Sequence, residues 1–346
     1  MRTNSFISSS KLILKIALLA AILLPVYFHL SDLYTETSEK NVTNRWNSQR
    51  FADLYALPAD SLDLVFIGSS HSYCTFDPAV FDAELGVTSI QMGMPLQFPD
   101  STYYTLREVL NYQKPRLAVM EVYWGVMDKP FDVKQADALF LSMKNDELIR
   151  DYIRNVFPPN EKVKYNIPIV RYQPDFLKFS NRELAAAVEE RYGVSVEGEI
   201  RSDGEYRNRG YIWSDLTIEP AKMGGRNQFN NFDGRKWNFD KTQKKYLGMI
   251  IDLCKNEGIG LMFVTAPVAP VSMERIKNYG AVHDRVREFA DANGIKYLDY
   301  NTEFIVPGEL FADGDFRDDA HLNDAGAKKA CGVLIDWLRE NNAIFN

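Results

Sequence analysis

The sequence predicts an α/β fold with a parallel central sheet and helices on both of its faces. The first indication is Leu64-Val65-Phe66-Ile67, an apolar run that is too short for a helix and typical of a strand buried on both sides. The second is an alternation of strand and helix patterns over residues 62–123, which resumes over residues 240–341. Such alternation favours parallel strands joined by right-handed crossovers. We therefore expect a three-layer, flavodoxin-like α/β domain over residues 61–346.

Local patterns predict the individual elements. Apolar runs predict strands at residues 62–67, 87–90, 116–123, 260–265 and 296–299. Apolar spacing and end signals predict helices at residues 78–84, 100–112, 240–256, 272–293 and 323–341. Asp77 followed by Pro78 is a typical helix start, and Asp100 or Ser101 is expected to cap the second helix. Gly258 and Gly294 stand where helices are expected to end.

Composition excludes several classes of protein. The chain has 346 residues, of which 46% are hydrophobic and 13% aromatic, so it can bury a large core. A formal net charge of -7 argues against nucleic-acid binding, which requires clustered lysine and arginine. The cysteines Cys74, Cys254 and Cys331 are odd in number and far apart, which indicates buried free thiols. We expect no cofactor and no metal, because no phosphate-binding glycine loop and no complete calcium-binding loop is present.

The N-terminal segment has the composition of a membrane helix. Residues 11–30 read KLILKIALLAAILLPVYFHL, which is about the length needed to cross a bilayer if Lys15 extends toward the headgroups. Arg2, Lys11 and Lys15 precede the apolar part of this run, which begins at Ile16, so the positive-inside rule predicts a cytoplasmic N-terminus and an extracytoplasmic body. A cleaved signal peptide is the alternative, although the run ends without a small-residue cleavage site. We expect residues 1–30 to be an uncleaved signal anchor and the polar residues 31–60 to be a linker.

A segment rich in Tyr, Asn, Arg and Lys interrupts the alternation from about residue 130 to 240. Helices are expected within it at residues 133–155 and 181–192, followed by an irregular glycine-rich part at residues 198–234. A long interruption between core elements is typical of a lid or a binding surface. Its aromatic side chains either stack on sugar rings or hold the insertion together, and we favour the second interpretation. They are Tyr206, Tyr211, Trp213, Phe229, Phe232 and Trp237.

Ser70 stands where a parallel α/β sheet places its ligands, just past the carboxyl end of the first predicted strand. A serine hydroxyl is a poor nucleophile unless a base lies within hydrogen-bond reach. His321 is the best candidate among the four histidines, because Asp318 precedes it by three residues. The carboxylate can accept from one ring nitrogen and hold the imidazole in the tautomer that takes the serine proton. Cys74 is a weaker alternative nucleophile, since it has no motif of its own.

Negative charge that develops on an attacked carbonyl requires hydrogen-bond donors. The Ser70 backbone N–H is the first candidate. The turn after the second predicted strand offers the N–H of Gly93 as the second. Alternatively, Gly93 only satisfies a turn that requires positive φ.

These residues resemble the motif blocks of a known superfamily. Gly68-Ser69-Ser70 after the first strand, Gly93 after the second and Asp318-x-x-His321 before the last helix resemble the SGNH (GDSL-like) hydrolases. IGSSH with a single N-terminal apolar helix is similar to the extracytoplasmic proteins of the DltD and alginate O-acetyltransferase type. The resemblance covers residues 60–125 and 240–346. It implies that Ser70 is the nucleophile, His321 the base, Asp318 the residue that orients it, and Gly93 an oxyanion donor.

The chain departs from this superfamily after the third strand. Glu121-Val122-Tyr123-Trp124 replaces the usual Gly-x-Asn-Asp block, so the asparagine donor is missing. Either the oxyanion hole has two donors, or a side chain such as Gln97 supplies the third. Losing one donor costs about 2.7–4 kcal/mol, which slow transfer to a positioned acceptor tolerates better than fast hydrolysis. We also expect His71, Tyr123 and Trp124 to contact the substrate.

Two functions are compatible with these observations. The first is a membrane-anchored serine esterase or O-acyltransferase that handles small O-acyl groups, above all acetyl, on a cell-surface glycan. The resemblance implies a membrane-bound O-acyltransferase as its partner. The second is a non-catalytic carbohydrate-binding or polysaccharide-assembly protein with a degenerate pocket, which the missing asparagine favours.

Overall fold

The structure is a computed structural model that describes residues 3–39, 45–140, 143–166, 197–198, 200–201, 204–223 and 225–341. It divides into two compact units. One comprises Met1–Arg45 and Phe157–Val194, and the other, called here the body, comprises Trp46–Val156 and Ser195–Asn346.

A five-stranded, fully parallel sheet forms the centre of the body, as the sequence predicts. Its strands are β1 (Leu64–Ile67), β2 (Ser89–Gln91), β3 (Leu117–Glu121), β7 (Gly260–Thr265) and β8 (Lys296–Asp299). They lie in the order β2-β1-β3-β7-β8, which is the flavodoxin-like order. All four residues of β1 are fully buried, because the strand is central and covered on both faces.

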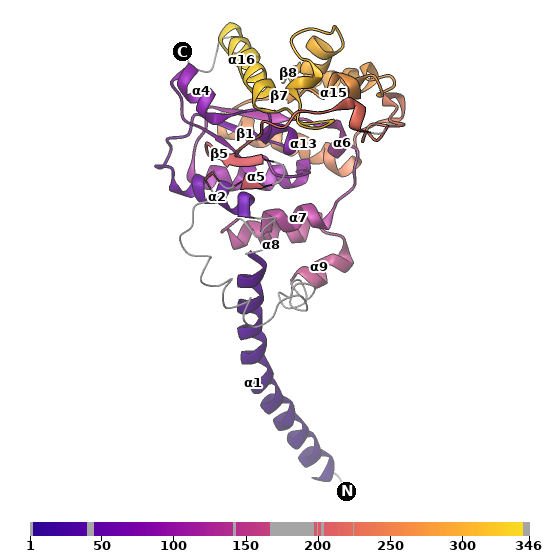
Figure 1. The fold of residues 1–346 in the computed structure, drawn as a ribbon. Coiled ribbons are helices and arrows are strands. Elements are labelled where there is room, and N and C mark those ends of the chain that lie inside the picture. Colours follow the sequence, from indigo (N-terminus) through magenta and orange to yellow (C-terminus); the bar gives the residue numbers. More distant parts are fainter. Residues whose placement is uncertain are drawn as a thin grey trace. The chain divides into compact units, whose positions relative to one another are not determined.

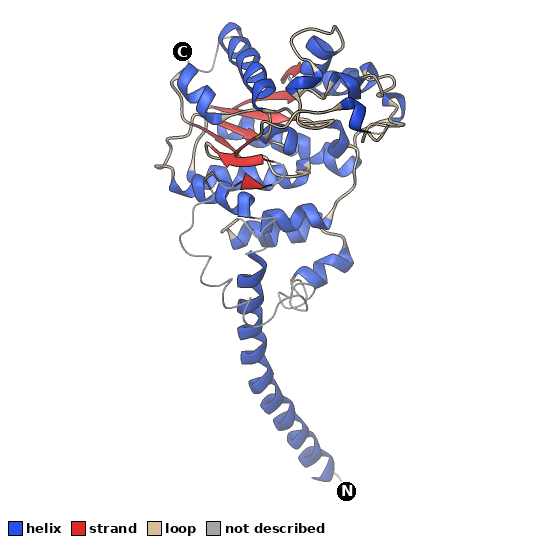
Figure 2. Ribbon diagram, in the orientation of Figure 1, coloured by secondary structure: helices blue, strands red, loops and turns tan. Residues whose placement is uncertain are grey.

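Helices cover the two faces of this sheet (Figures 1 and 2). On one face α4 (Pro78–Leu85) packs against α16 (Asp324–Glu340), and on the other α5 (Pro99–Tyr112) packs against α13 (Lys241–Glu257). Two predicted caps hold, because Asp77 accepts from a backbone N–H of the first turn of α4 and Gly258 is the C-cap of α13. The short elements are α3 (Ser70–Tyr73), α6 (Trp124–Met127), η2 (Pro220–Met223), η3 (Gly234–Lys236), η4 (Asn301–Ile305) and η5 (Asp313–Asp315).

The helix expected at residues 100–112 differs from the prediction in its N-cap. In α5 the N-cap is Phe98 rather than Asp100 or Ser101, because Pro99 occupies the first turn. The Asp100 carboxylate instead accepts from Tyr152 and Gln243, which joins α5 to α13 and to α8 (Asp146–Val156).

The helix expected at residues 272–293 is two helices, α14 (Pro270–Met273) and α15 (Gly280–Ala292). Between them Asn278 adopts a positive φ of 54°, and the backbone of Lys277 forms an isolated parallel β-bridge with that of Asp233. A Cβ on Gly234 would lie 2.3 Å from the Asn278 carbonyl oxygen. Tertiary contact with the 233–234 segment therefore interrupts a pattern that sequence alone favours as continuous.

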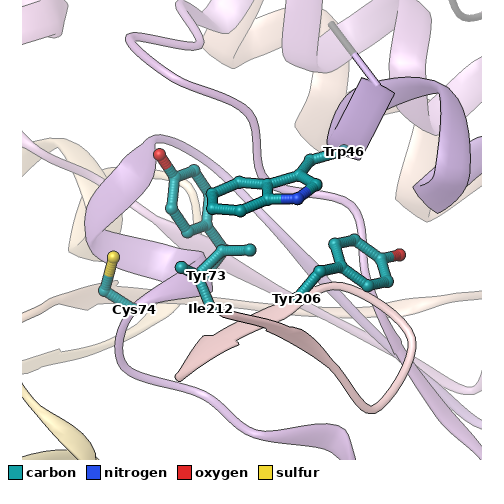
Figure 3. Packing of buried hydrophobic residues seen from close by; sticks show 5 residues of the cluster. All are labelled: Trp46, Tyr73, Cys74, Tyr206 and Ile212. Carbon is teal, nitrogen blue, oxygen red and sulfur yellow. The ribbon is translucent and has the colours of Figure 1, made fainter. Parts of the chain in front are cut away.

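The linker expected at residues 31–60 is wrong where the structure describes it. Residues 31–39 continue the N-terminal helix, and α2 (Arg45–Ala56) belongs largely to the body. Figure 3 shows Trp46 of α2 among Tyr73 of α3, Cys74 just after it, Tyr206 of β5 (Gly204–Arg207) and Ile212 of β6 (Tyr211–Trp213). Helical spacing places Trp46, Phe51 and Leu54 on one buried face, despite the polar composition of the segment.

Replacing Phe51 by alanine should therefore destabilise the body by about 3–5 kcal/mol, since the ring is 1% exposed and its removal leaves a cavity. The free energy of unfolding in urea measures the effect. Ala52→Ser on the exposed face of the same helix is the control and should change it by less than about 0.5 kcal/mol. Equal stability of both variants would show that α2 is only a linker.

The insertion contains more structure than expected. Two helices, α7 (Val133–Phe140) and α8, replace the single helix expected at residues 133–155. The expected helix at residues 181–192 lies outside the described residues. Within the glycine-rich part, β4 (Ile200–Arg201), β5 (Gly204–Arg207) and β6 (Tyr211–Trp213) form an antiparallel sheet. Four of its aromatic side chains are buried, which supports the interpretation that they hold the insertion together: Tyr206, Tyr211, Phe229 and Trp237.

The other unit contains α1 (Thr3–Glu39) and α9 (Pro159–Tyr165). Residues Ser10–His29 of α1 are long and apolar enough to cross a membrane or to serve as a signal sequence, and none of this stretch is buried. Pro25 lies within the helix.

Candidate functional site

Ser70 begins α3 immediately after β1, so its side chain lies at the carboxyl edge of the parallel sheet. Gly68 makes the preceding turn with φ of 135°, a conformation that favours glycine. A Cβ at Gly68 would also lie 2.8 Å from both the Cβ and the carbonyl oxygen of Glu121 at the end of β3. The turn that presents Ser70 therefore requires glycine for both its conformation and its close contact with β3.

Asp318 and His321 reach the same place from the loop before α16. His321 Nε2 lies 2.8 Å from Ser70 Oγ, and His321 Nδ1 lies 2.9 Å from Asp318 Oδ2. Asp318 also accepts from the backbone N–H groups of Ala320 and His321, so the loop holds its own carboxylate in place. The structure thus joins a hydroxyl, an imidazole and a carboxylate in one continuous line, over a sequence distance of 251 residues between Ser70 and His321.

The protonation states in this line follow from Asp318. Burial alone would raise the pKa of Asp318, but hydrogen bonds from His321 and from the Ala320 N–H lower it below its ordinary value. The ionised carboxylate can only accept, so His321 carries its proton on Nδ1. The bare Nε2 then accepts from the Ser70 hydroxyl, which is the arrangement that activates a serine nucleophile.

Comparisons with known proteins add a likeness in structure alone. No protein-family model and no curated protein matches this sequence. A solved structure of a GDSL-like lipase from Bacteroides thetaiotaomicron is similar, with a TM-score of 0.40 and 12% identity over 86% of this chain and 99% of that one. A Bacteroides fragilis protein described as an acylhydrolase is similar with a TM-score of 0.39 and 12% identity, over 87% of this chain and 97% of that one.

Arg317 links the two segments that carry the site, and sequence analysis missed it. Its Nη2 lies 2.9 Å from Cys74 Sγ, one turn after Ser70, and its Nε lies 3.7 Å from Asp318 Oδ2. Its backbone N–H donates to the His321 carbonyl. Cys74 is fully buried against the Arg317 guanidinium, so its thiol is placed for structure rather than for attack. The other two free cysteines, Cys254 and Cys331, are also buried.

The oxyanion donors differ from expectation. The Ser70 N–H has no acceptor among the described residues, so it can bind an oxyanion. The Gly93 N–H, by contrast, donates to Gln91 Oε1 at 2.9 Å and is already satisfied. Gln97 is 1% exposed, and its Nε2 is 3.3 Å from Thr105 Oγ1. The contacts therefore support neither Gly93 nor Gln97 as a donor in this conformation.

His71 and Tyr123 lie beside the line of three residues. The His71 ring stacks on Tyr123 with centroids 3.9 Å apart and lies 4.7 Å from the His321 ring, so it does not diverge from the site as neighbouring side chains usually do. Burial, and then the nearby His321, lowers the pKa of His71 well below its ordinary value. We expect a neutral His71 imidazole that packs against the His321 ring, while Tyr123 remains a candidate for substrate contact.

Trp124 does not fit the predicted role in substrate binding. Its side chain is 1% exposed and packs among Phe229, Phe232 and Tyr279. Its carbonyl accepts from the indole N–H of Trp237. Trp124 therefore anchors the insertion to the end of β3.

A polar contact at the rim of the site was also not predicted. Gln228 donates to Asp319 from both its backbone N–H and its Nε2, each at 2.7 Å. Tyr123 Oη is 3.4 Å from Gln228 Oε1. The adjacent carboxylates Asp318 and Asp319 thus have separate partners, a distinction that the sequence alone does not reveal.

Glu121 lies below the site and gives a prediction on stability. Burial raises its pKa to about 7, although hydrogen bonds from Ser69 offset part of the shift. Because the folded-state pKa exceeds the unfolded value, the folded state favours the protonated carboxyl group. The contribution of Glu121 to the free energy of unfolding is therefore complete below about pH 4.5 and is lost as pH rises through about 7. Replacing Glu121 by glutamine should remove this contribution.

The difference in unfolding free energy between the two proteins measures it. Relative to Glu121→Gln, the unmodified protein should lose as much as about 3 kcal/mol between pH 4.5 and pH 8. Parallel pH curves for the two proteins would contradict the raised pKa.

Within the described part of the chain, no cluster of three or more His, Cys, Asp or Glu side chains is placed to hold a metal ion.

Proposed function

We propose that this chain is a membrane-anchored, extracytoplasmic serine O-acyltransferase or esterase that acts on small O-acyl groups, above all acetyl, of a cell-surface glycan. The observation that carries the proposal is the continuous contact from Ser70 through His321 to Asp318. Its position at the carboxyl edge of a parallel sheet supports a ligand site there. The glycan and the acetyl group rest on the resemblance to the DltD and alginate O-acetyltransferase type.

The reaction has two halves. Ser70 Oγ attacks the acyl carbonyl while its proton moves to His321 Nε2, and the Ser70 N–H stabilises the oxyanion. Collapse breaks the ester bond, His321 protonates the departing hydroxyl, and the acyl group stays on Ser70. An acceptor hydroxyl then gives its proton to His321 and attacks the carbonyl of the acyl-enzyme. Collapse breaks the bond between the acyl carbon and Ser70 Oγ, and His321 returns the proton to Ser70 Oγ, which restores the free serine and the neutral imidazole. The acceptor is a sugar in transfer and water in hydrolysis.

The proposed location rests on α1. Its stretch Ser10–His29 is apolar enough to span a bilayer, and the basic residues Arg2, Lys11 and Lys15 lie before this stretch or in its N-terminal part. A single anchor of this kind would hold the body beside the membrane surface, where a membrane-bound O-acyltransferase could supply acyl groups.

Turnover by the full-length protein in detergent tests the function. We expect release of nitrophenol from 4-nitrophenyl acetate, and acetate release or acetyl exchange with O-acetylated oligosaccharides. Adding a non-acetylated oligosaccharide should divert acetyl from water to sugar if transfer is the natural reaction. No turnover of any acetyl ester, with the protein folded, would refute the proposal.

A second function has one specific observation in its favour. The Gly93 N–H is bound to Gln91 Oε1, so only the Ser70 N–H is available as a backbone donor among the oxyanion candidates. A weak oxyanion hole suits a protein that binds glycans without turning them over. Glycan binding that is equal in the unmodified protein and in His321→Ala, with no ester cleavage by either, would favour it.

A further inference from the structure

A buried carboxylate lies directly beneath the nucleophile turn and takes no part in the reaction described above. Glu121 is the last residue of β3, is 1% exposed, and contacts the turn between β1 and α3. Its Oε2 accepts from the Ser69 backbone N–H at 3.0 Å and from Ser69 Oγ at 2.7 Å. Its Oε1 is buried and has no hydrogen-bond partner within the described residues. The carboxylate therefore directs one oxygen wholly to Ser69.

Ser69 passes this restraint to the residue on the other side of Ser70. Its Oγ is the N-cap of α3, where it accepts from the His71 N–H at 3.2 Å and lies 3.3 Å from His71 Nδ1. The His71 ring in turn packs against His321. Both neighbours of Ser70 in the chain thus belong to one buried hydrogen-bonded line, Glu121–Ser69–His71, which runs beside Asp318–His321–Ser70.

We propose that Glu121 is a positioning residue for Ser70: through Ser69 it fixes the nucleophile turn and the His71 ring, so that Ser70 Oγ meets His321 Nε2. The inference rests on the proposed function. It assigns a role to the position at which the chain departs from the SGNH pattern. Glu121 stands at the glycine of the Gly-x-Asn-Asp block that this chain lacks, and its acidic side chain holds the turn from below.

The hydrogen positions show what a substitution must preserve. Ser69 Oγ has one proton, which it donates to Glu121, so it accepts from His71 at both the backbone N–H and Nδ1–H. Only the acceptor oxygen Oε2 is needed, in either protonation state of the carboxyl group. Glutamine can supply that oxygen and place its amide nitrogen at the unpartnered Oε1 position, whereas alanine supplies neither.

The test measures the second-order rate constant for labelling of the full-length protein by a fluorophosphonate probe. We expect Glu121→Ala to lower this rate constant about 100-fold, as misplacement of a reacting group by about 1 Å does. Glu121→Gln should remain within about threefold of the unmodified protein. Glu108→Ala is the matched control. Glu108 lies on α5 and is also a fully buried carboxylate, but it accepts from Tyr55 of α2 and from Asn111 of α5 and not from the turn at Ser70. It should lower stability and leave the labelling rate constant unchanged.

Each outcome decides between the alternatives. Labelling of folded Glu121→Ala at the unmodified rate would overturn the role, as would a Glu121→Gln variant that loses as much as Glu121→Ala. If Glu121→Ala does not fold, Ser69→Ala takes its place, with an expected loss of about tenfold. An unchanged rate in Ser69→Ala would then overturn the inference. Absence of labelling in the unmodified protein would instead refute the proposed function.

Discussion

Ser70→Ala should lower kcat for an aryl acetate by about 10⁵- to 10⁶-fold, because removing the nucleophile of such a hydrogen-bonded group abolishes its cooperative action. The hydroxyl is only partly buried, and its contact is with His321, so the fold should persist. Steady-state nitrophenol release measures the loss, with near-ultraviolet circular dichroism as the check on folding.

Cys74→Ala is the informative comparison for this variant. The thiol lies one turn after Ser70 and is fully buried against Arg317, so its loss removes packing and not a reacting group. We expect at least about a tenth of the activity to remain, since misplacement through a neighbouring contact costs far less than loss of the nucleophile. Activity that survives in Ser70→Ala but disappears in Cys74→Ala would show that Cys74, and not Ser70, is the nucleophile.

Asp318→Asn should lower kcat by about 10⁴-fold, the second largest effect we expect. The amide can donate to His321 Nδ1, which would move the ring proton to Nε2 and remove the acceptor for the Ser70 hydroxyl. Because the pKa of Asp318 is lowered, the carboxylate is ionised throughout the neutral range, so the substitution removes a negative charge as well as the acceptor for His321 Nδ1–H.

Asp319→Asn is its matched control, because the two carboxylates are adjacent in sequence but only Asp318 contacts His321. Replacing Asp319 loosens the contact with Gln228 at the rim, and we expect a loss of less than about tenfold. Equal losses of kcat in the two variants would show that the local negative charge, and not the orientation of the His321 imidazole, determines the rate.

The sequence predicted the central sheet because its strands are local patterns. The bounds of β7 and β8 agree with the prediction. Asp77 and Gly258 were recognisable as caps because cap signals are local as well. The break between α14 and α15 was not predictable, because a contact from the distant segment at Asp233 produces it.

The candidate site shows the same division. Ser70 and His321 could be placed together because strand ends and the loop before a final helix converge at one edge of a parallel sheet. The Gly93 N–H, predicted as an oxyanion donor, is bonded to a side chain, Gln91, a contact that the sequence does not reveal. Glu121 had a visible signal, a carboxylate at the end of an otherwise apolar strand, but its partner Ser69 appears only in three dimensions.

The most direct test of Ser70 as the acyl-accepting nucleophile is to locate the acyl group itself. Full-length protein quenched with acid during turnover of 4-nitrophenyl acetate would be digested and analysed by peptide mass spectrometry. We predict an acetyl group on the Ser70 hydroxyl, increased in Asp318→Asn if deacylation is slowed more than acylation, and absent in Ser70→Ala. Acetyl on another residue, such as Cys74, or turnover with no acetylated peptide at any time, would contradict the mechanism.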